Sequence, residues 1–106
     1  MAKILIIDDE KNIRDGIKKS LEYEGYEVVT AENGDKGIDI VYKGGIDLVI
    51  TDLKMPEKTG EEFLKYVLDF DKHIPVIILT GHGNIETAVD MMRLGAYDFM
   101  TKPFNL

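Results

Sequence analysis

Residues able to bind a metal ion or a phosphoryl group follow four of the five short apolar runs in this chain. Asp8 and Asp9 follow the first run, Asp52 the third, Thr80 the fourth and Lys102 the fifth. Carboxylates bind hard cations, whereas a hydroxyl and an ammonium donate hydrogen bonds to phosphoryl oxygens. A hydrophobic core does not require this order of polar residues. The pattern therefore predicts a site for a divalent cation and a phosphoryl group.

The segments between these residues alternate between strand and helix patterns. Short β-branched or apolar runs predict strands at residues 4–7, 27–30, 48–50, 76–79 and 97–100. Amphipathic spacing predicts helices at residues 10–24, 33–44, 59–70 and 84–95. Ile38, Val41 and Tyr42 should face inward on the second helix, and the apolar spacing of the fourth runs through Ile85, Ala88, Met92 and Leu94. This alternation predicts an α/β fold in which a parallel sheet is wound with helices on both faces. Ligands of such folds bind beyond the carboxyl ends of the strands, where the polar residues lie.

Length, charge and composition restrict the classes of function. The 106 residues form one domain, and hydrophobic and charged residues make up 44% and 31% of it, as in ordinary globular proteins. A net charge of −7 argues against nucleic acid or an anionic membrane as a direct partner of this domain. Cysteine is absent, which excludes disulfides and thiol chemistry. No apolar run has the length of a signal peptide or membrane span, so we expect a cytoplasmic protein.

The chemistry of the polar residues assigns each a role. Three nearby carboxylates repel one another unless a cation lies among them, and an all-oxygen site favours Mg²⁺. Asp52 is the candidate nucleophile, because a carboxylate oxygen can accept a phosphoryl group as an acyl phosphate. Thr80 and Lys102 would then bind the phosphoryl oxygens. Each residue alone also fits an ordinary role: Asp9 a helix cap, Thr80 a strand residue and Lys102 a surface charge.

The motifs in this order resemble the receiver domain of bacterial two-component response regulators. The resemblance covers the whole chain and rests on IIDDE at residues 6–10, DLKMP at 52–56, TGHG at 80–83 and GAYDFMTKPF at 95–104. The last two motifs are most similar to receivers of enhancer-binding transcription activators. The family fold implied is a flavodoxin-like five-stranded parallel sheet with strand order 2-1-3-4-5.

The resemblance also implies a mechanism for this chain. Asp52 would accept a phosphoryl group from a sensor histidine kinase, and Mg²⁺ would be held by Asp8, Asp9, Asp52 and the backbone carbonyl of Lys54. Thr80 and Lys102 would contact the phosphoryl group. The domain would catalyse only its own phosphorylation and dephosphorylation, without acting as an enzyme on other substrates.

Two further residues of the resemblance concern the switch and the lifetime of the phosphate. Phe99 matches an aromatic position that turns inward when Thr80 moves, although many relatives have Tyr there. The fourth helix and fifth strand would then change the face read by an output domain or partner. Lys54 and His82 flank the phosphoryl group in the family, where they would affect its hydrolysis; His82 also fits a plain loop residue.

The family fold ends in a fifth helix, for which residues 1–106 leave no room. Asn105 would suit the start of a helix. Such a helix, burying about 400 Å² of apolar surface, would contribute on the order of 10 kcal/mol. We therefore expect residues 1–106 to be a single receiver domain truncated before its last helix. The alternative is that a second chain covers the uncovered face in a homodimer.

Two other classes of function are compatible with parts of the pattern. A phosphatase of similar fold would use an aspartyl phosphate with Mg²⁺, but would need a second acid where this chain has Lys54. A binding module that keeps only the fold would not need the five polar residues together. Incubation with acetyl phosphate and Mg²⁺ separates these classes from a receiver.

Overall fold

The chain alternates strictly between parallel strands and helices. The computed structural model describes residues 2–53, 60–81 and 85–101. Its elements are β1 (Lys3–Ile7), α1 (Lys11–Tyr23), β2 (Glu27–Ala31), α2 (Gly34–Tyr42), β3 (Leu48–Asp52), α3 (Gly60–Phe70), β4 (Val76–Thr80), α4 (Ile85–Leu94) and β5 (Asp98–Thr101). Each strand and helix expected from the sequence is present. No helix within the described residues is long and apolar enough to cross a membrane.

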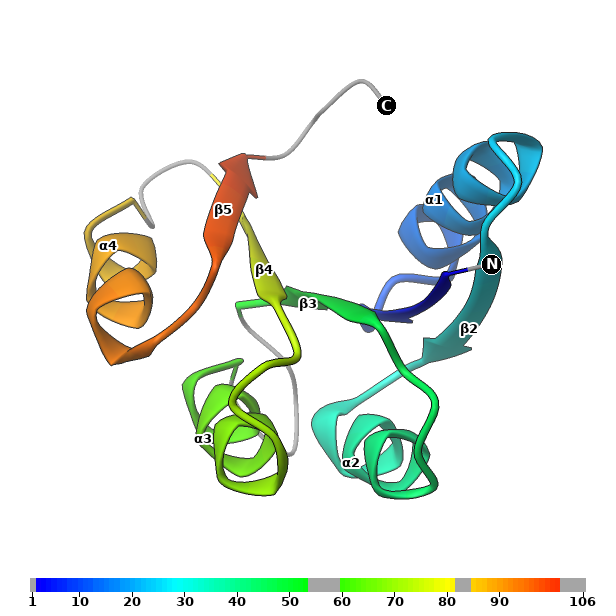
Figure 1. Cartoon of the computed structure of the whole chain (residues 1–106). Coiled ribbons are helices and arrows are strands. Elements are labelled where there is room, and N and C mark those ends of the chain that lie inside the picture. The colour runs from blue at the N-terminus through cyan, green and yellow to red at the C-terminus, as the bar shows by residue number, and fades with distance from the viewer. Residues whose placement is uncertain (1, 54–59, 82–84, 102–106) are drawn as a thin grey trace.

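The five strands form one parallel sheet in the order β2-β1-β3-β4-β5. This order confirms the predicted doubly wound fold and places the polar β2 at an edge. The order reverses at β1, where the chain first moves outward to β2 and then returns to the other side of β1 as β3 (Figure 1). A crevice therefore opens beyond the carboxyl ends of β1 and β3. Asp8 and Asp9 follow the first of these strands, and Asp52 ends the second.

The two faces of the sheet are covered unequally. Helix α1 packs on one face, whereas α2, α3 and α4 pack on the other (Figure 1). Alternate residues of the buried strands serve the two faces, so that Leu5 and Ile7 join the larger cluster while Ile4 and Ile6 join the smaller one. This alternation explains why β1, β3 and β4 are almost continuously apolar: each strand is covered on both faces.

Helix α2 begins as predicted, but the expected inward orientation of Tyr42 is wrong. The Asn33 side chain accepts a hydrogen bond from the Lys36 backbone N–H at 2.9 Å, the usual arrangement of an N-cap. Tyr42 is half exposed and stacks on Phe70 of α3, with ring centroids 5.0 Å apart, instead of entering the core.

Helix α4 buries only some of its apolar residues. Its buried residues are Ala88 and Met91. Ile85 and Leu94, which belong to the apolar spacing that predicted the helix, are 42% and 43% exposed. Apolar residues occur around most of this helix, so its apolar spacing alone does not define which side is buried.

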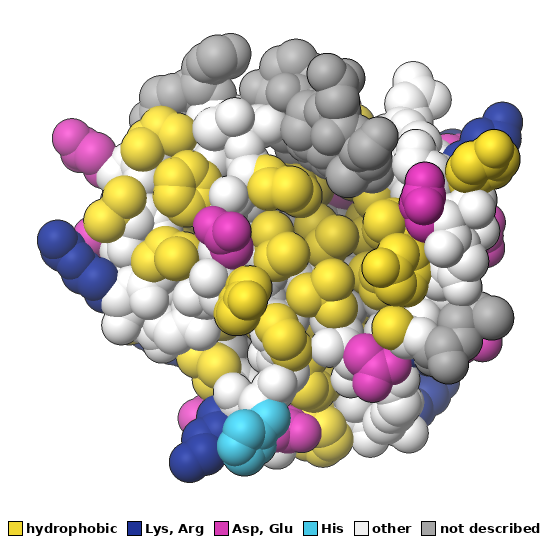
Figure 2. Space-filling view, turned by 45° about the horizontal axis from the view of Figure 1, so that its top comes forward, with side chains coloured by type: hydrophobic (Ala, Val, Ile, Leu, Met, Phe, Trp, Pro, Cys, Tyr) yellow, Lys and Arg dark blue, Asp and Glu magenta, His cyan; other side chains and the backbone are white. Residues whose placement is uncertain are grey.

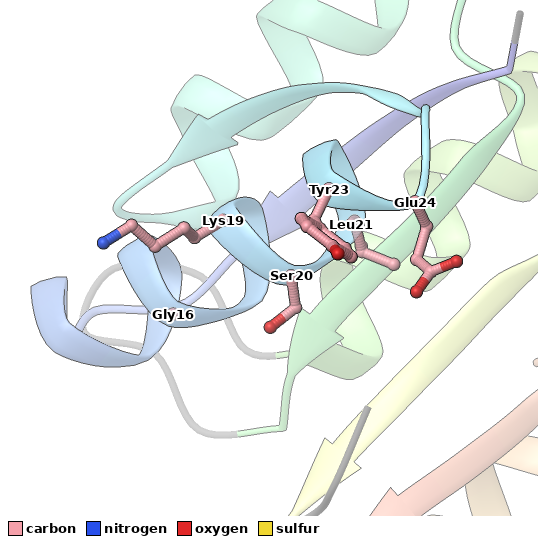
Figure 3. A pocket seen from close by; sticks show the side chains of 6 residues that line it. All are labelled: Gly16, Lys19, Ser20, Leu21, Tyr23 and Glu24. Carbon is pink, nitrogen blue, oxygen red and sulfur yellow. The ribbon is translucent and has the colours of Figure 1, made fainter.

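The face that carries α1 leaves apolar side chains partly open. The partly buried hydrophobic residues that pack against the smaller cluster are Ile13, Leu21, Leu48, Ile77 and Met100. Figure 2, which brings the top of Figure 1 forward, shows hydrophobic side chains gathered over the middle of this face. Among the described residues, only α1 packs there, and a groove of about 800 Å³ runs along that helix. The groove residues labelled in Figure 3, including Ser20, Leu21 and Tyr23, belong to α1, apart from Glu24, which is the C-cap residue of that helix.

The packing of α2 against the sheet predicts opposite effects for two Gly→Ala substitutions. A methyl group at Gly37 would collide with Ile7 Cδ1 and lie 3.0 Å from Cε1 of the buried Phe63. At Gly16 in α1 the methyl group would meet no atom within 4 Å. Gly37→Ala should therefore lower the free energy of unfolding by about 1–3 kcal/mol, the usual cost of overpacking. Gly16→Ala should raise it by about 0.5–1 kcal/mol, the helix-propensity gain. Urea unfolding of both variants tests this, and equal effects would contradict the packing of α2.

Candidate functional site

The three predicted carboxylates lie together at the carboxyl end of the sheet. Asp8 and Asp9 come directly after β1, and Asp52 is the last residue of the neighbouring β3. One carboxylate oxygen from each residue lies within 4.8 Å of the other two. The convergence follows from the sheet order, because β1 and β3 pair in parallel and end side by side.

Asp8 is held by hydrogen bonds on its backbone and its side chain. The residue is fully buried. Its backbone N–H donates to the Ala31 carbonyl at 3.2 Å, and its Oδ1 accepts from the Glu10 N–H at 2.9 Å. Its carbonyl oxygen accepts a hydrogen bond from Arg14 Nη1 at 2.7 Å. Asp9, in contrast, is exposed. The pair therefore offers one buried and one accessible carboxylate.

Asp52 is only 9% exposed, and its backbone is tightly packed. The Thr51 hydroxyl donates to the Asp52 carbonyl at 3.1 Å. A Cβ at Gly60, the first residue of α3, would lie 2.9 Å from that same carbonyl oxygen. The absence of a side chain at Gly60 thus allows α3 to begin directly behind Asp52.

Thr80 lies beside this cluster on the next strand. It is fully buried at the end of β4, and its hydroxyl donates to the Gly81 carbonyl at 3.3 Å. Leu79 pairs with Asp52 in the β3–β4 register, so Thr80 lies one residue beyond the level of Asp52. Thr80 also pairs with Thr101 of β5, the residue immediately before Lys102.

The remaining predicted residues are less completely described. Lys54, His82 and Lys102 lie outside the described residues. Phe99 is on β5, where its ring is partly buried and packs against the larger core cluster. Its backbone N–H donates to Asp98 Oδ1 at 2.8 Å. The ring thus packs against the core on one side and is partly exposed to solvent.

The donors of the cluster suit a hard divalent cation. All three are carboxylates, and Mg²⁺ prefers oxygen ligands at about 2.0–2.1 Å. Two ligands on one octahedral ion lie roughly 3–4 Å apart at such bond lengths. A spread of up to 4.8 Å therefore fits an ion that contacts some of these carboxylates directly and others through water. The residues present fit a magnesium site.

Comparison with known proteins supports the same conclusion. The sequence profile of the family described as "Response regulator receiver domain" matches residues 4–106. The chain belongs to this family. It is therefore a phosphorylation-switched signalling module of two-component systems, and the family is not one of classic enzymes. Receiver domains bind Mg²⁺ at an acidic pocket, and the aspartate cluster provides one here.

Individual relatives extend this picture. The crystal structure of a response regulator receiver domain from Clostridium thermocellum superposes with a TM-score of 0.95 at 43% identity, covering 99% of this chain and 85% of that one. The uncharacterized transcriptional regulatory protein YkoG of Bacillus subtilis is 40% identical over 103 residues, which are 97% of this chain and 45% of YkoG. The regulatory protein AtoC of Escherichia coli is 36% identical over 104 residues, 98% of this chain and 23% of AtoC.

These matches confirm the receiver family predicted from the motifs. They include the expected likeness to enhancer-binding regulators, of which AtoC is one. The receiver domain spans less than half the length of YkoG and about a quarter of AtoC.

Three residues that support the site were not singled out in the sequence. Thr51 donates a hydrogen bond to the Asp52 carbonyl, and Arg14 donates one to the Asp8 carbonyl. Gly60 has no side chain that would collide with the Asp52 carbonyl. Thr51 had a visible signal, because it is polar within an otherwise apolar run. The contacts of Arg14 and Gly60 are with backbone atoms, which have no signature in the sequence.

Charge repulsion at the cluster makes a test possible without phosphorylation. Asp9→Asn should raise the free energy of unfolding in EDTA by about 1 kcal/mol, because one of three neighbouring negative charges is removed. The same substitution should remove most of the stabilisation that added Mg²⁺ gives the unsubstituted chain. Asp69→Asn is the matched control, since Asp69 is exposed near the far end of α3. Thermal unfolding with EDTA and with Mg²⁺ measures both effects. A free energy of unfolding in EDTA that changes no more in Asp9→Asn than in the control would contradict the repulsion.

Proposed function

We propose that Asp52 is the phosphoacceptor of this receiver domain and that Asp8, Asp9 and Asp52, with the Lys54 backbone carbonyl, hold Mg²⁺. The observation that carries the proposal is the convergence of three carboxylates, two of them almost fully buried, at the end of β1 and β3. Burial of charged groups is costly without compensation. A fold that gathers three of them therefore serves a ligand of opposite charge.

The chemistry is a transfer to a carboxylate oxygen. An oxygen of Asp52 attacks the phosphorus of a phosphohistidine, a new P–O bond forms, and the P–N bond to the imidazole breaks. Mg²⁺ supplies positive charge to the phosphoryl oxygens when bound. Water later attacks the phosphorus, releasing inorganic phosphate and restoring the carboxylate. The domain thus catalyses only its own phosphorylation and dephosphorylation.

Thr80 and Lys102 would bind the phosphoryl group and report its presence. Thr80 donates its hydroxyl hydrogen to a neighbouring carbonyl at 3.3 Å, a long hydrogen bond that a charged phosphoryl oxygen can replace. Because Thr80 ends β4, its displacement moves the start of the segment that leads to α4. Phe99 of β5 pairs with Ile78 of β4, the strand that Thr80 ends. As the switch residue, Phe99 would reorient when Thr80 moves.

The face formed by α4 and β5 is the surface that we propose an output domain or partner reads. Ile85, Val89 and Leu94 of α4 and Tyr97 before β5 are all exposed hydrophobic residues. A sensor histidine kinase is the proposed phosphoryl donor, and the receiver domain is proposed to act in the cytoplasm. The relatives with transcriptional functions favour an output in transcription that is carried out by another part of the protein or by a partner.

The uncovered side of the sheet is, in our proposal, the packing site of a further helix of the same protein. The partly open side chains there include Leu48, Ile77 and Met100. The receiver domain from Clostridium thermocellum extends beyond the matched region, which covers 85% of it. An amphipathic helix on this face would cover the central strands as α1 covers the edge. A second copy of the chain is the alternative cover.

Phosphorylation by a small donor tests the assignment of Asp52. Incubation with acetyl phosphate and Mg²⁺ should add one phosphoryl group, seen as a single mass increase that mild base removes. Asp52→Asn should abolish the increase, because an amide cannot replace the carboxylate as nucleophile. Asp69→Asn on the exposed surface of α3 should leave it unchanged.

Other outcomes distinguish the competing functions. Repeated release of phosphate from acetyl phosphate in large excess over the protein, with saturation by other phosphate esters, would identify a phosphatase. No modification of the unsubstituted domain would leave a module that binds without phosphorylation. A mass increase that persists in Asp52→Asn would place the phosphoacceptor elsewhere.

The uncovered face makes a prediction about association. Residues 1–106 alone should bind a dye specific for apolar surfaces or should dimerise at micromolar concentration, since an open apolar face attracts partners. Ile77→Lys on this face should reduce both signals, whereas Val89→Lys on α4 should not. Light scattering and dye fluorescence measure these effects. A stable monomer that binds no dye would contradict the proposed packing site.

A further inference from the structure

We propose that Arg14 is a positioning residue for the metal carboxylates, because its guanidinium fixes the peptide bond that joins Asp8 to Asp9. The inference rests on the proposed magnesium site. It concerns a residue of α1 that contributes no ligand atom and follows Asp8 and Asp9 in the sequence.

The decisive contact is a hydrogen bond to the main chain. Arg14 Nη1 donates to the Asp8 carbonyl oxygen at 2.7 Å, at the short end of the usual range. That carbonyl belongs to the planar peptide group whose N–H is that of Asp9. Fixing the oxygen therefore fixes the plane from which the Asp9 side chain departs. Asp9 depends on this restraint because its own side chain is exposed.

Further hydrogen bonds at the start of α1 also hold the Asp8–Asp9 loop. Glu10, the N-cap residue of α1, makes no capping hydrogen bond with its side chain. Instead the Asp8 carboxylate accepts from the Glu10 N–H, and the Arg14 N–H donates to the Glu10 carbonyl at 3.1 Å. Arg14 thus closes the turn twice, through its backbone at Glu10 and through its side chain at Asp8. Loss of the side chain would remove the hydrogen bond that fixes the orientation of the peptide between the two carboxylates.

The choice of arginine also suggests a specific role. The chain has eleven lysines and only two arginines, Arg14 and Arg93. Arg14 is half buried, whereas Arg93 is exposed on α4 and forms only a loose ion pair with Asp90 at 3.8 Å. A planar guanidinium with five donors can hold a carbonyl and still face other groups.

The charge of Arg14 also acts on Glu32, a residue outside the Asp8–Asp9 loop. The pKa of Glu32, which follows β2, lies below its usual value, mainly because Lys36 hydrogen-bonds to its carboxylate and attracts it. The charge of Arg14 adds a smaller contribution in the same direction. The charge of Arg14 therefore also acts on the residue that follows β2.

Charge and positioning predict opposite effects on metal binding. A positive charge near the site repels Mg²⁺, so that removal of Arg14 would tighten binding if charge alone mattered. If Arg14 orients the carboxylates, its removal weakens binding, as the loss of supporting contacts does at other metal sites. The sign of the change in affinity therefore decides between the two.

The experiment compares Arg14→Met with Arg14→Lys and with Arg93→Met as the matched control. Methionine keeps the unbranched stem and removes the charge and the donors. Calorimetric titration of each intact protein with MgCl₂ should give a dissociation constant about tenfold higher for Arg14→Met. Arg14→Lys should weaken binding about threefold, because an ammonium on a flexible stem lacks the planar, fixed fork of donors of a guanidinium. Arg93→Met should bind as the unsubstituted protein does.

Two measurements without metal separate positioning from a general loss of structure. In EDTA, the amide resonances of Asp9 and Glu10 should shift or broaden in Arg14→Met, while those of β4 and β5 remain in place. Unfolding of each variant in EDTA measures the fraction of protein that is folded under the conditions of the titration. If Arg14→Met does not fold, an affinity of Arg14→Lys equal to that of the unsubstituted protein overturns the inference.

The remaining outcomes are also decisive. Tighter or unchanged Mg²⁺ binding in a folded Arg14→Met would overturn the positioning role and leave the magnesium site intact. If the unsubstituted protein binds no Mg²⁺, the proposed site fails and the inference fails with it. Weaker binding at equal folded fraction, partly restored by lysine, supports the role.

Discussion

The repulsion among Asp8, Asp9 and Asp52 is the interaction on which the rest of this structure depends. Two unit charges about 5 Å apart repel by about 1 kcal/mol in water and about 3 kcal/mol at the effective dielectric of a protein surface. Three such pairs use a substantial part of the roughly 5–15 kcal/mol by which domains are stable. The buried strands β1 and β3 hold the carboxylates in place despite this cost. A cation, or the conversion of one carboxylate to another group, then changes the balance for the whole end of the sheet.

The sequence predicted the residues of the site more completely than it predicted which side chains are buried in the core. Parallel strands bring their carboxyl ends to one edge, so residues that follow alternating strands must meet once the fold is recognised. This geometry joins Asp8 to Asp52 across more than forty residues of chain. The roles of Lys54, His82 and Lys102 stay predictions, because these residues lie outside the described ranges.

The orientation of side chains depended on partners that the sequence does not show. Tyr42 fits the apolar spacing of α2, yet stacking on Phe70 satisfies its ring at the surface. Ile85 and Leu94 fit the apolar spacing of α4 but are exposed. Helix α4 carries apolar residues on several sides, and Ala88 and Met91 are the ones that it buries. Arg14 escaped notice for a different reason. Its partner is a carbonyl oxygen, which every residue has, so no pairing of residue types indicates the contact.

The helices differ in how firmly the core holds them, and this difference bears on signalling. Helix α3 buries Phe63, Leu64 and Val67 completely, whereas α4 buries only Ala88 and Met91. Elements with few buried apolar contacts move at the lowest free-energy cost. Helix α4 is therefore the element that a small displacement of Thr80 can shift most easily. Its exposed Ile85 and Val89 make such a shift visible to a partner.

Helix α1 is weakly held for another reason, and its attachment affects the chemistry. Only Ile17 of this helix is buried, because the sheet beside α1 is uncovered in the described part of the chain. The same helix carries Arg14, which is hydrogen-bonded to the Asp8 carbonyl. Whatever covers the open face adds apolar contacts to α1 and thereby limits its movement relative to β1. Cover on that face and order in the Asp8–Asp9 loop are thus coupled through one helix. Metal affinity should then depend on a surface that contains no metal ligand.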